Sequence, residues 1–167
     1  MIRMKTTEAE NPMGDEILDL PAIAMLRHLQ AGRNKNLNRG FRKLNVWREA
    51  IDLYAFEKKI LGDVKGLPFK IRDQVLDSAF SISSNLAEGY CRKSIKEYIQ
   101  FVNVALGSAG ENYSQMYALL RSGEISKDIF DEFDIRHYSV ENKLSNLAKS
   151  LSKKMKTGQD WNSDYKT

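Results

Sequence analysis

The chain has 167 residues, of which 42% are hydrophobic and 29% are charged, which fits one globular domain with a sizeable core. Its net charge of +4 and pI of about 9.1 permit binding to nucleic acid or to an anionic surface but do not require it. The single cysteine, Cys91, excludes an intrachain disulfide and a cysteine-rich zinc site, and no run approaches the ~18 apolar residues of a membrane span.

Residues 1–40 are predicted to be a flexible extension of the folded domain. Residues 1–14 are polar, and acidic residues stand where a secretion signal would need apolar ones, so we expect a cytoplasmic protein. Residues 15–30 have a loose helical period that allows one short amphipathic helix. Residues 31–40 contain two glycines, three asparagines and three basic residues, which is typical of a linker. Two interpretations stay open for the extension: a solvated tail, mostly disordered, or a regulatory or docking segment.

Two helices are predicted in the first half of the domain. Apolar residues recur at helical spacing over residues 44–61, and Gly62 and Gly66 end that segment. A second helix is predicted over residues 70–89, after a turn at Pro68. The predicted buried side of the first helix consists of Trp47, Ala50, Ile51, Tyr54, Ala55 and Leu61. That of the second consists of Ile71, Val75, Ser78, Ala79, Ile82, Leu86 and Gly89.

A third helix is predicted over residues 94–121. Ser94 followed by Glu97 is the capping-box pattern, which stabilises a helix start by about 1 kcal/mol. Gly107 and Gly110 lie inside the helix, where each costs up to about 1 kcal/mol relative to alanine, and we expect close helix packing to explain them. The predicted buried side consists of Tyr98, Phe101, Val102, Ala105, Ser108, Ala109, Asn112, Met116, Leu119 and Leu120.

A fourth helix is predicted from its N-cap, Ser126, to about Lys156, and residues 157–167 are expected to be a frayed tail. Its predicted buried side consists of Ile129, Phe133, Val140, Leu144, Leu147 and Leu151. Long helices joined by short connections favour antiparallel neighbours. The sequence therefore predicts an all-α protein, an up-down-up-down antiparallel four-helix bundle over residues 41–156.

The sequence contains no recognisable catalytic, metal-binding or cofactor-binding motif. A di-metal site in a four-helix bundle needs two Glu-x-x-His pairs, whereas this chain has two histidines, His28 and His137, and only Asp134 stands at that spacing. Cys91 lies beside Arg92, which could lower the pKa of the thiol, but no histidine is close in sequence. Phosphate-binding loops and dinucleotide fingerprints are missing. We expect a protein that is not an enzyme and that uses no metal or cofactor.

Polar residues on the core-facing sides of the second and third helices are predicted to have a structural role. An unpaired buried carboxylate is costly, so each is expected to find a partner and to cross-link helices in a fixed register. A polar functional site is the alternative interpretation. With the glycine at the end of the second helix, the predicted structural set is Asn85, Glu88, Gly89 and Glu111.

Six basic residues form the candidate nucleic-acid interface: Arg42, Lys43, Arg48, Arg92, Lys93 and Lys96. Alternate helices of an up-down bundle begin at the same end, so these six side chains are predicted to share one end. Basic groups next to helix N-termini bind phosphates. A basic surface scattered over the bundle is the alternative. A separate lysine cluster lies near the C-terminus, at Lys149, Lys153, Lys154 and Lys156.

Three stretches carry a family resemblance: FRKLNVWREAIDLY, QVLDSAFSISSNLAEGYCRKSIKEYIQFVNVALGSAGE, and the helix that follows them. The most specific part is Ser81–Gly89, with Arg92 and Ser94 after it. Together these stretches resemble the small bacterial four-helix-bundle proteins of 23S ribosomal RNA intervening sequences, over about two-thirds of the chain. Leu76 and Asp77 depart from the resemblance, because the family usually has basic residues there.

The resemblance implies a four-helix protomer that assembles into a ring, commonly a homopentamer. A similar protein is the accessory protein of diversity-generating retroelements, which is basic and pentameric and works with a reverse transcriptase and its template nucleic acid. Most members of the wider family have no established activity. The first hypothesis is therefore an oligomeric, non-enzymatic protein that associates with RNA or DNA, with a reverse transcriptase as a candidate partner. The alternative is a structural or adaptor protein that binds a protein partner and has no nucleic-acid role.

Overall fold

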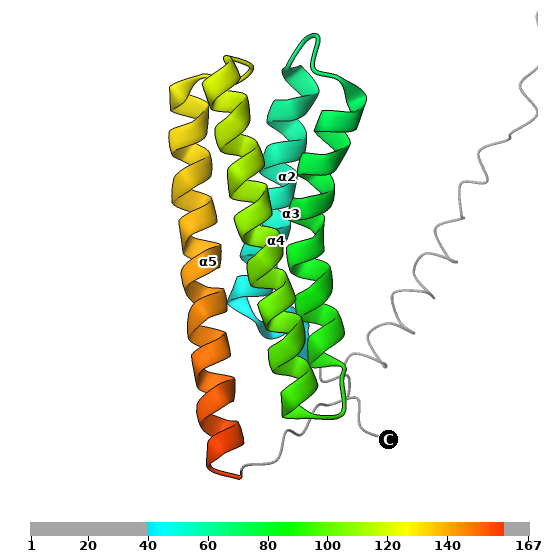
Figure 1. Cartoon of the computed structure of the whole chain (residues 1–167), viewed down its shortest axis with the longest axis vertical. Coiled ribbons are helices and arrows are strands. Elements are labelled where there is room, and N and C mark those ends of the chain that lie inside the picture. Colours follow the sequence, from blue (N-terminus) through cyan, green and yellow to red (C-terminus); the bar gives the residue numbers. More distant parts are fainter. Residues whose placement is uncertain (1–39, 159–167) are drawn as a thin grey trace, which may run out of the picture. The chain divides into compact units, whose positions relative to one another are not determined.

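The computed structural model describes residues 40–158, which fold into one short 3-10 helix and four long α-helices (Figure 1). The 3-10 helix is η1 (Gly40–Lys43), and the four α-helices are α2 (Asn45–Asp63), α3 (Phe69–Tyr90), α4 (Ile95–Ser122) and α5 (Lys127–Lys156). Successive helices run in opposite directions, which confirms the predicted all-α up-down-up-down bundle. The predicted extension before Gly40 and the tail after Gly158 lie outside the described residues. None of the helices in residues 40–158 is long and apolar enough to cross a membrane.

Local signals in the sequence determine where the helices begin and end. The Ser94 hydroxyl accepts a hydrogen bond from the Glu97 backbone amide and donates one to the Glu97 carboxylate, so the predicted capping interaction is present. Ser126 caps α5 in the same way, by accepting from the Ile129 amide. Gly123 ends α4 in the left-handed conformation, with φ of 84°, which glycine adopts without steric cost.

The core runs the length of the bundle and is lined by all four helices. The predicted buried side of α3 is correct except for Ile71, which is exposed. The predicted buried side of α2 is wrong by a rotation of the helix: Trp47 and Tyr54 are only half-buried and Ala55 is exposed. These two aromatic rings instead pack at the edge of the bundle, against Phe41 and Phe80 respectively. The residues of α2 that are buried are Val46, Ala50, Leu53, Glu57 and Leu61.

Glycines in α3 and α4 differ in what they contact. A Cβ atom at Gly89 would lie 2.6 Å from the Phe101 Cβ and 2.9 Å from the Tyr98 Cδ2, so the end of α3 approaches α4 at a distance that only glycine permits. The expected close packing at Gly107 and Gly110 is wrong within the protomer, since a Cβ at either would meet no atom within 4 Å.

Candidate nucleic-acid interface

The six basic residues proposed from the sequence lie at one end of the bundle, on η1, the start of α2, the turn from α3 into α4 and the first turn of α4 (Figure 1). The ring of Phe41 in η1 lies 6.4 Å from that of Tyr90 at the end of α3, which places these two segments side by side. The side chains of Arg42, Lys43, Arg48, Lys93 and Lys96 are exposed there.

Two of the arginines make local contacts that limit their freedom. Arg92 is half-buried, pairs with Glu88 one turn earlier and lies 4.7 Å from the centre of the Phe101 ring. Its charge is therefore partly compensated within the protomer. Arg48 Nε donates a 2.9 Å hydrogen bond to the Arg42 carbonyl oxygen, which fastens η1 to the first turns of α2.

The lysines near the C-terminus belong to the same end, a feature that we did not infer from the sequence. Lys143 of α5 pairs at 2.7 Å with Glu49 of α2, so the second half of α5 lies beside the start of α2. Lys149, Lys153, Lys154 and Lys156 follow on α5 and are exposed, and that helix continues past the turn between α3 and α4 (Figure 1). The antiparallel order of the four predicted helices already implied this position.

Charge is consequently divided along the length of the bundle. We define the basic half as residues 40–52, 82–104 and 141–158; within it, eleven Lys and Arg face five Asp and Glu. The other half, residues 53–81 and 105–140, has eight Lys and Arg against ten Asp and Glu. A phosphate backbone would therefore be attracted to one end of the bundle rather than to the whole surface.

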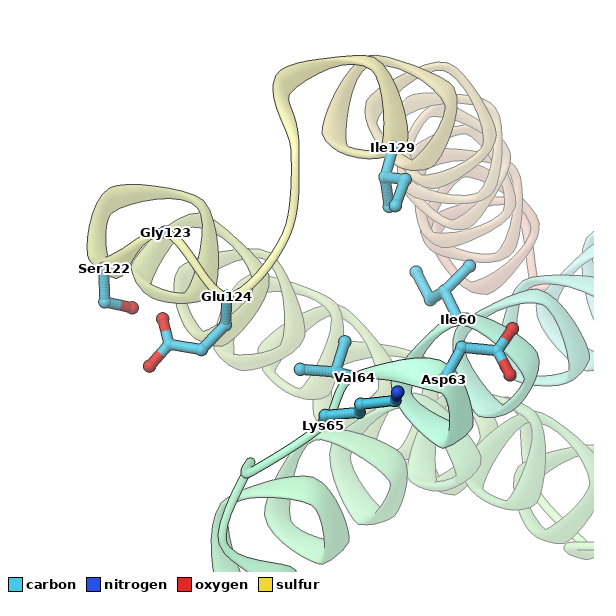
Figure 2. A pocket seen from close by; sticks show the side chains of 8 residues that line it. All are labelled: Ile60, Asp63, Val64, Lys65, Ser122, Gly123, Glu124 and Ile129. Atoms are coloured by element: carbon cyan, nitrogen blue, oxygen red, sulfur yellow. The ribbon is translucent and has the colours of Figure 1, made fainter.

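The opposite end has a hollow of different character, with a volume of about 500 Å³. It opens where α2 ends, α4 ends and α5 begins, and Ile60 and Ile129 face each other across it (Figure 2). The carboxylates of Asp63 and Glu124 and the amine of Lys65 lie at its rim, as Figure 2 shows. This set contains neither a nucleophile–base pair nor a cluster of basic groups, so it offers no chemistry of its own.

None of the three polar residues predicted to cross-link helices, Asn85, Glu88 and Glu111, does so directly in the protomer. Glu88 is exposed and pairs with Arg92 at the start of the following turn. Glu111 is exposed and accepts a hydrogen bond from Gln115 of the same helix. Asn85 is half-buried and donates to the backbone and hydroxyl of Ser81, again within one helix. Each of these side chains lies beside the buried stripe of its helix rather than in it.

A buried polar link between helices is formed by Glu57 and Asn112, both fully buried. Asn112 Nδ2 lies 2.8 Å from Glu57 Oε2, 3.2 Å from the Val75 carbonyl oxygen and 3.2 Å from Ser78 Oγ, which joins α2, α3 and α4 at mid-height. Burial raises the pKa of Glu57 to about 8, although the hydrogen bond from Asn112 acts in the opposite direction. The Glu57 carboxyl is therefore mostly protonated at neutral pH.

Cys91 and His137, two described residues considered for catalysis or metal binding, have surroundings that suit neither role. Arg92 does not lower the pKa of the Cys91 thiol: partial burial raises that pKa, and Arg92 is paired with Glu88. His137 is buried, and its Nε2 lies 2.8 Å from the Ala109 carbonyl oxygen. In residues 40–158, no three His, Cys, Asp or Glu side chains are close enough together to hold a metal ion. His28 lies outside the described residues.

Comparison with known proteins agrees with the fold. The family model described as 23S rRNA-intervening sequence protein matches residues 42–153. No curated protein matches the chain. A solved structure from Bacteroides thetaiotaomicron VPI-5482, described as a protein with unknown function from the S23 ribosomal protein family, superposes with a TM-score of 0.58. It is 21% identical, and the match covers 62% of this chain and 98% of that one, so the similarity supports the fold alone.

Proposed function

The chain belongs to the 23S rRNA-intervening sequence protein family, and we propose that it is a non-enzymatic, oligomeric protein that binds the backbone of RNA or DNA at the basic half of its bundle. The observation that carries this proposal is the division of charge: eleven basic residues against five acidic ones in one half, and eight against ten in the other. Exposed lysines beside the start of α4 provide both point charges and a helix N-terminus for phosphates.

A salt titration of binding tests the proposal directly. Fluorescence anisotropy with labelled RNA and DNA between about 50 and 200 mM salt should give log K that falls linearly with log salt concentration, because each neutralised phosphate releases counterions. Replacing Lys93 and Lys96 with glutamine should weaken binding about tenfold and reduce the slope by about 1–2. The control replaces Lys58 and Lys59, two lysines of α2 that are also exposed but lie in the other half. Absence of binding at low salt, or binding that salt does not affect, would rule out the proposal.

Self-association is the second part of the proposal, with a ring of five protomers favoured by the family resemblance. Large apolar side chains are exposed on the protomer, including Phe80 at 53% and Tyr138 at 64%, and such surfaces often mark interfaces. Gly107 and Gly110 also leave room on α4 for a close neighbour that the protomer itself does not supply. Native mass measurement of the purified chain gives the number of protomers, and a monomer at all accessible concentrations would exclude this part.

The same exposed apolar residues favour the alternative, an adaptor that binds another protein and has no nucleic-acid role. A reverse transcriptase as that partner, or as a partner that shares the nucleic acid, is supported by the family resemblance alone. Co-purification of the tagged chain with a co-expressed reverse transcriptase, with and without nuclease treatment, distinguishes direct contact between the two proteins from association through a shared nucleic acid. A complex that survives nuclease treatment supports direct contact, and the lack of any complex argues against this partner.

A further inference from the structure

We propose that a groove on the C-terminal third of α5 is a second phosphate-binding site, which takes single-stranded nucleic acid by its backbone and continues the basic end of the bundle. This inference rests on the proposed nucleic-acid function and adds a site to it. The groove is a shallow, open hollow with a volume of about 520 Å³, and the described residues that line it come from α5 and its C-cap residue, Thr157. Three lysines and three hydroxyl side chains line it: Lys149, Lys153, Lys156, Ser145, Ser152 and Thr157.

Helical spacing places the three lysines on one face of α5. They stand at positions i, i+4 and i+7, whereas Lys154 points elsewhere and does not line the groove. At a rise of about 1.5 Å per residue, Lys149 and Lys156 are separated by about 10.5 Å along the axis. About three phosphates of a stacked strand occupy that length, at roughly 3.4 Å for each nucleotide of one strand. The three lysines therefore span a length that several successive phosphates of one strand also span.

The charge of these lysines is not compensated by neighbours in the described part of the chain. Lys149, Lys153 and Lys156 are exposed, and none of them forms an ion pair there. The last acidic residue of α5 is Glu141, two turns before Lys149. Lysines in a last turn also stabilise the negative end of the helix dipole, but that effect falls off within one turn and does not explain Lys149.

The hydroxyl side chains that line the groove distinguish it from a plain basic surface. Ser145 and Ser152 are half-buried and stand seven residues apart, so they lie on the same side of α5 as the lysines. Hydroxyl side chains donate to phosphate oxygens and position a backbone without reading its bases. Binding in the groove is therefore expected to be independent of base sequence.

Replacement of Lys149, Lys153 and Lys156 together by glutamine tests the site. With labelled single-stranded RNA as the probe, the slope of log K against log salt should decrease by about 2, since each phosphate contact on a single strand contributes about 0.7. Affinity at low salt should fall about 10- to 100-fold. The matched control replaces Lys58, Lys59 and Lys70, three exposed lysines of the other half, and should leave both quantities unchanged. Circular dichroism confirms that both variants keep their helices.

A measurement on the unaltered chain makes the test independent of variant folding. Acetylation of lysines followed by mass spectrometry, with and without the RNA, should show protection of Lys149, Lys153 and Lys156 but not of Lys58 and Lys59. The inference is overturned if the chain binds RNA in a salt-dependent manner while the triple variant binds like the control and the three lysines stay unprotected. If the unaltered chain fails to bind at all, the proposed function fails and this site fails with it.

Discussion

Glu57 is the residue whose environment departs furthest from what its chemistry favours. Its carboxyl is fully buried, Oε2 accepts from Asn112, and neither Oε1 nor Asn112 Oδ1 has a hydrogen-bond partner in the described part of the chain. An ionised carboxylate would be buried without a cation, which explains why its pKa is raised from 4.5 to about 8. The folded protein then holds a proton that the unfolded chain releases, so the free energy of unfolding should fall as pH rises from about 4.5 to about 8.

Replacement of Glu57 by glutamine should remove this pH dependence. Glutamine keeps the shape, cannot ionise, and brings an amide donor for the orphaned acceptor of Asn112. In the variant, the contribution of residue 57 to the free energy of unfolding should not depend on pH. We therefore expect the variant to be more stable than the unaltered chain at pH 8 by roughly 2–4 kcal/mol. Urea unfolding across the same pH range measures both quantities. Glu111→Gln, at an exposed carboxylate, serves as the control and should leave the slope as it is. A Glu57→Gln variant whose free energy of unfolding keeps the same pH dependence as that of the unaltered chain would contradict the raised pKa of Glu57.

At the scale of helices, Gly89 and Gly107 allow a paired prediction about packing. Gly89→Ala places a methyl group 2.6 Å from the Phe101 Cβ, so α3 and α4 must move apart, and we expect a loss of about 1–2 kcal/mol after the gain in helix propensity. Gly107→Ala adds the same methyl group in open space and should stabilise the protomer by about 0.5–1 kcal/mol. Thermal unfolding of both variants checks the difference in sign. Equal changes in stability for the two variants would mean that helix propensity alone, and not the contact with Phe101, determines the effect.

Helix boundaries were predictable to within about two residues, because Pro68, Ser94, Gly123 and Ser126 act locally on the backbone. Which polar side chains are buried could not be predicted. Adjacent residues of a helix point about 100° apart, so a small error in the assumed rotation of the helix makes an exposed side chain look buried. Glu111 was chosen as an inward residue in addition to its neighbour Asn112, and only Asn112 is buried. The protonation state of Glu57 could not be predicted either, since a carboxylate in a sequence gives no sign that it will be buried as a neutral acid.

At the scale of the whole molecule, the candidate interface depends on topology more than on any motif. Six basic residues on two separate segments were expected to converge because alternate helices start together, and the structure brings those segments side by side. The same reasoning would have added the lysines near the end of α5 to the candidate interface, because α5 ends at the end of the bundle where α2 and α4 begin. Exposure of individual apolar residues could not be derived in this way, because it depends on how each helix is rotated about its axis.

The exposed aromatic residues lie on two different sides of the bundle and lead to a prediction about assembly. Phe80 contacts Tyr54 on the side formed by α2 and α3, whereas Tyr113 and Tyr117 stack on each other on the side formed by α4 and α5. Two unlike surfaces on one protomer fit a head-to-tail contact, which closes into a ring or extends into a filament. Phe80→Asp and Tyr117→Asp should therefore each abolish assembly of the purified chain, since each removes one side of the contact.

Mixing the two variants provides the decisive measurement. Phe80→Asp keeps the α4–α5 side intact and Tyr117→Asp keeps the α2–α3 side, so an equimolar mixture should form heterodimers and nothing larger, as read by native mass spectrometry. Lys154→Asp is the control, because Lys154 is exposed in the last turn of α5, whereas Tyr117 packs against Phe130 in the first turn of that helix. This control should assemble like the unaltered chain. Mixtures that stay monomeric, or single variants that still assemble, would place the contact between protomers elsewhere on the surface.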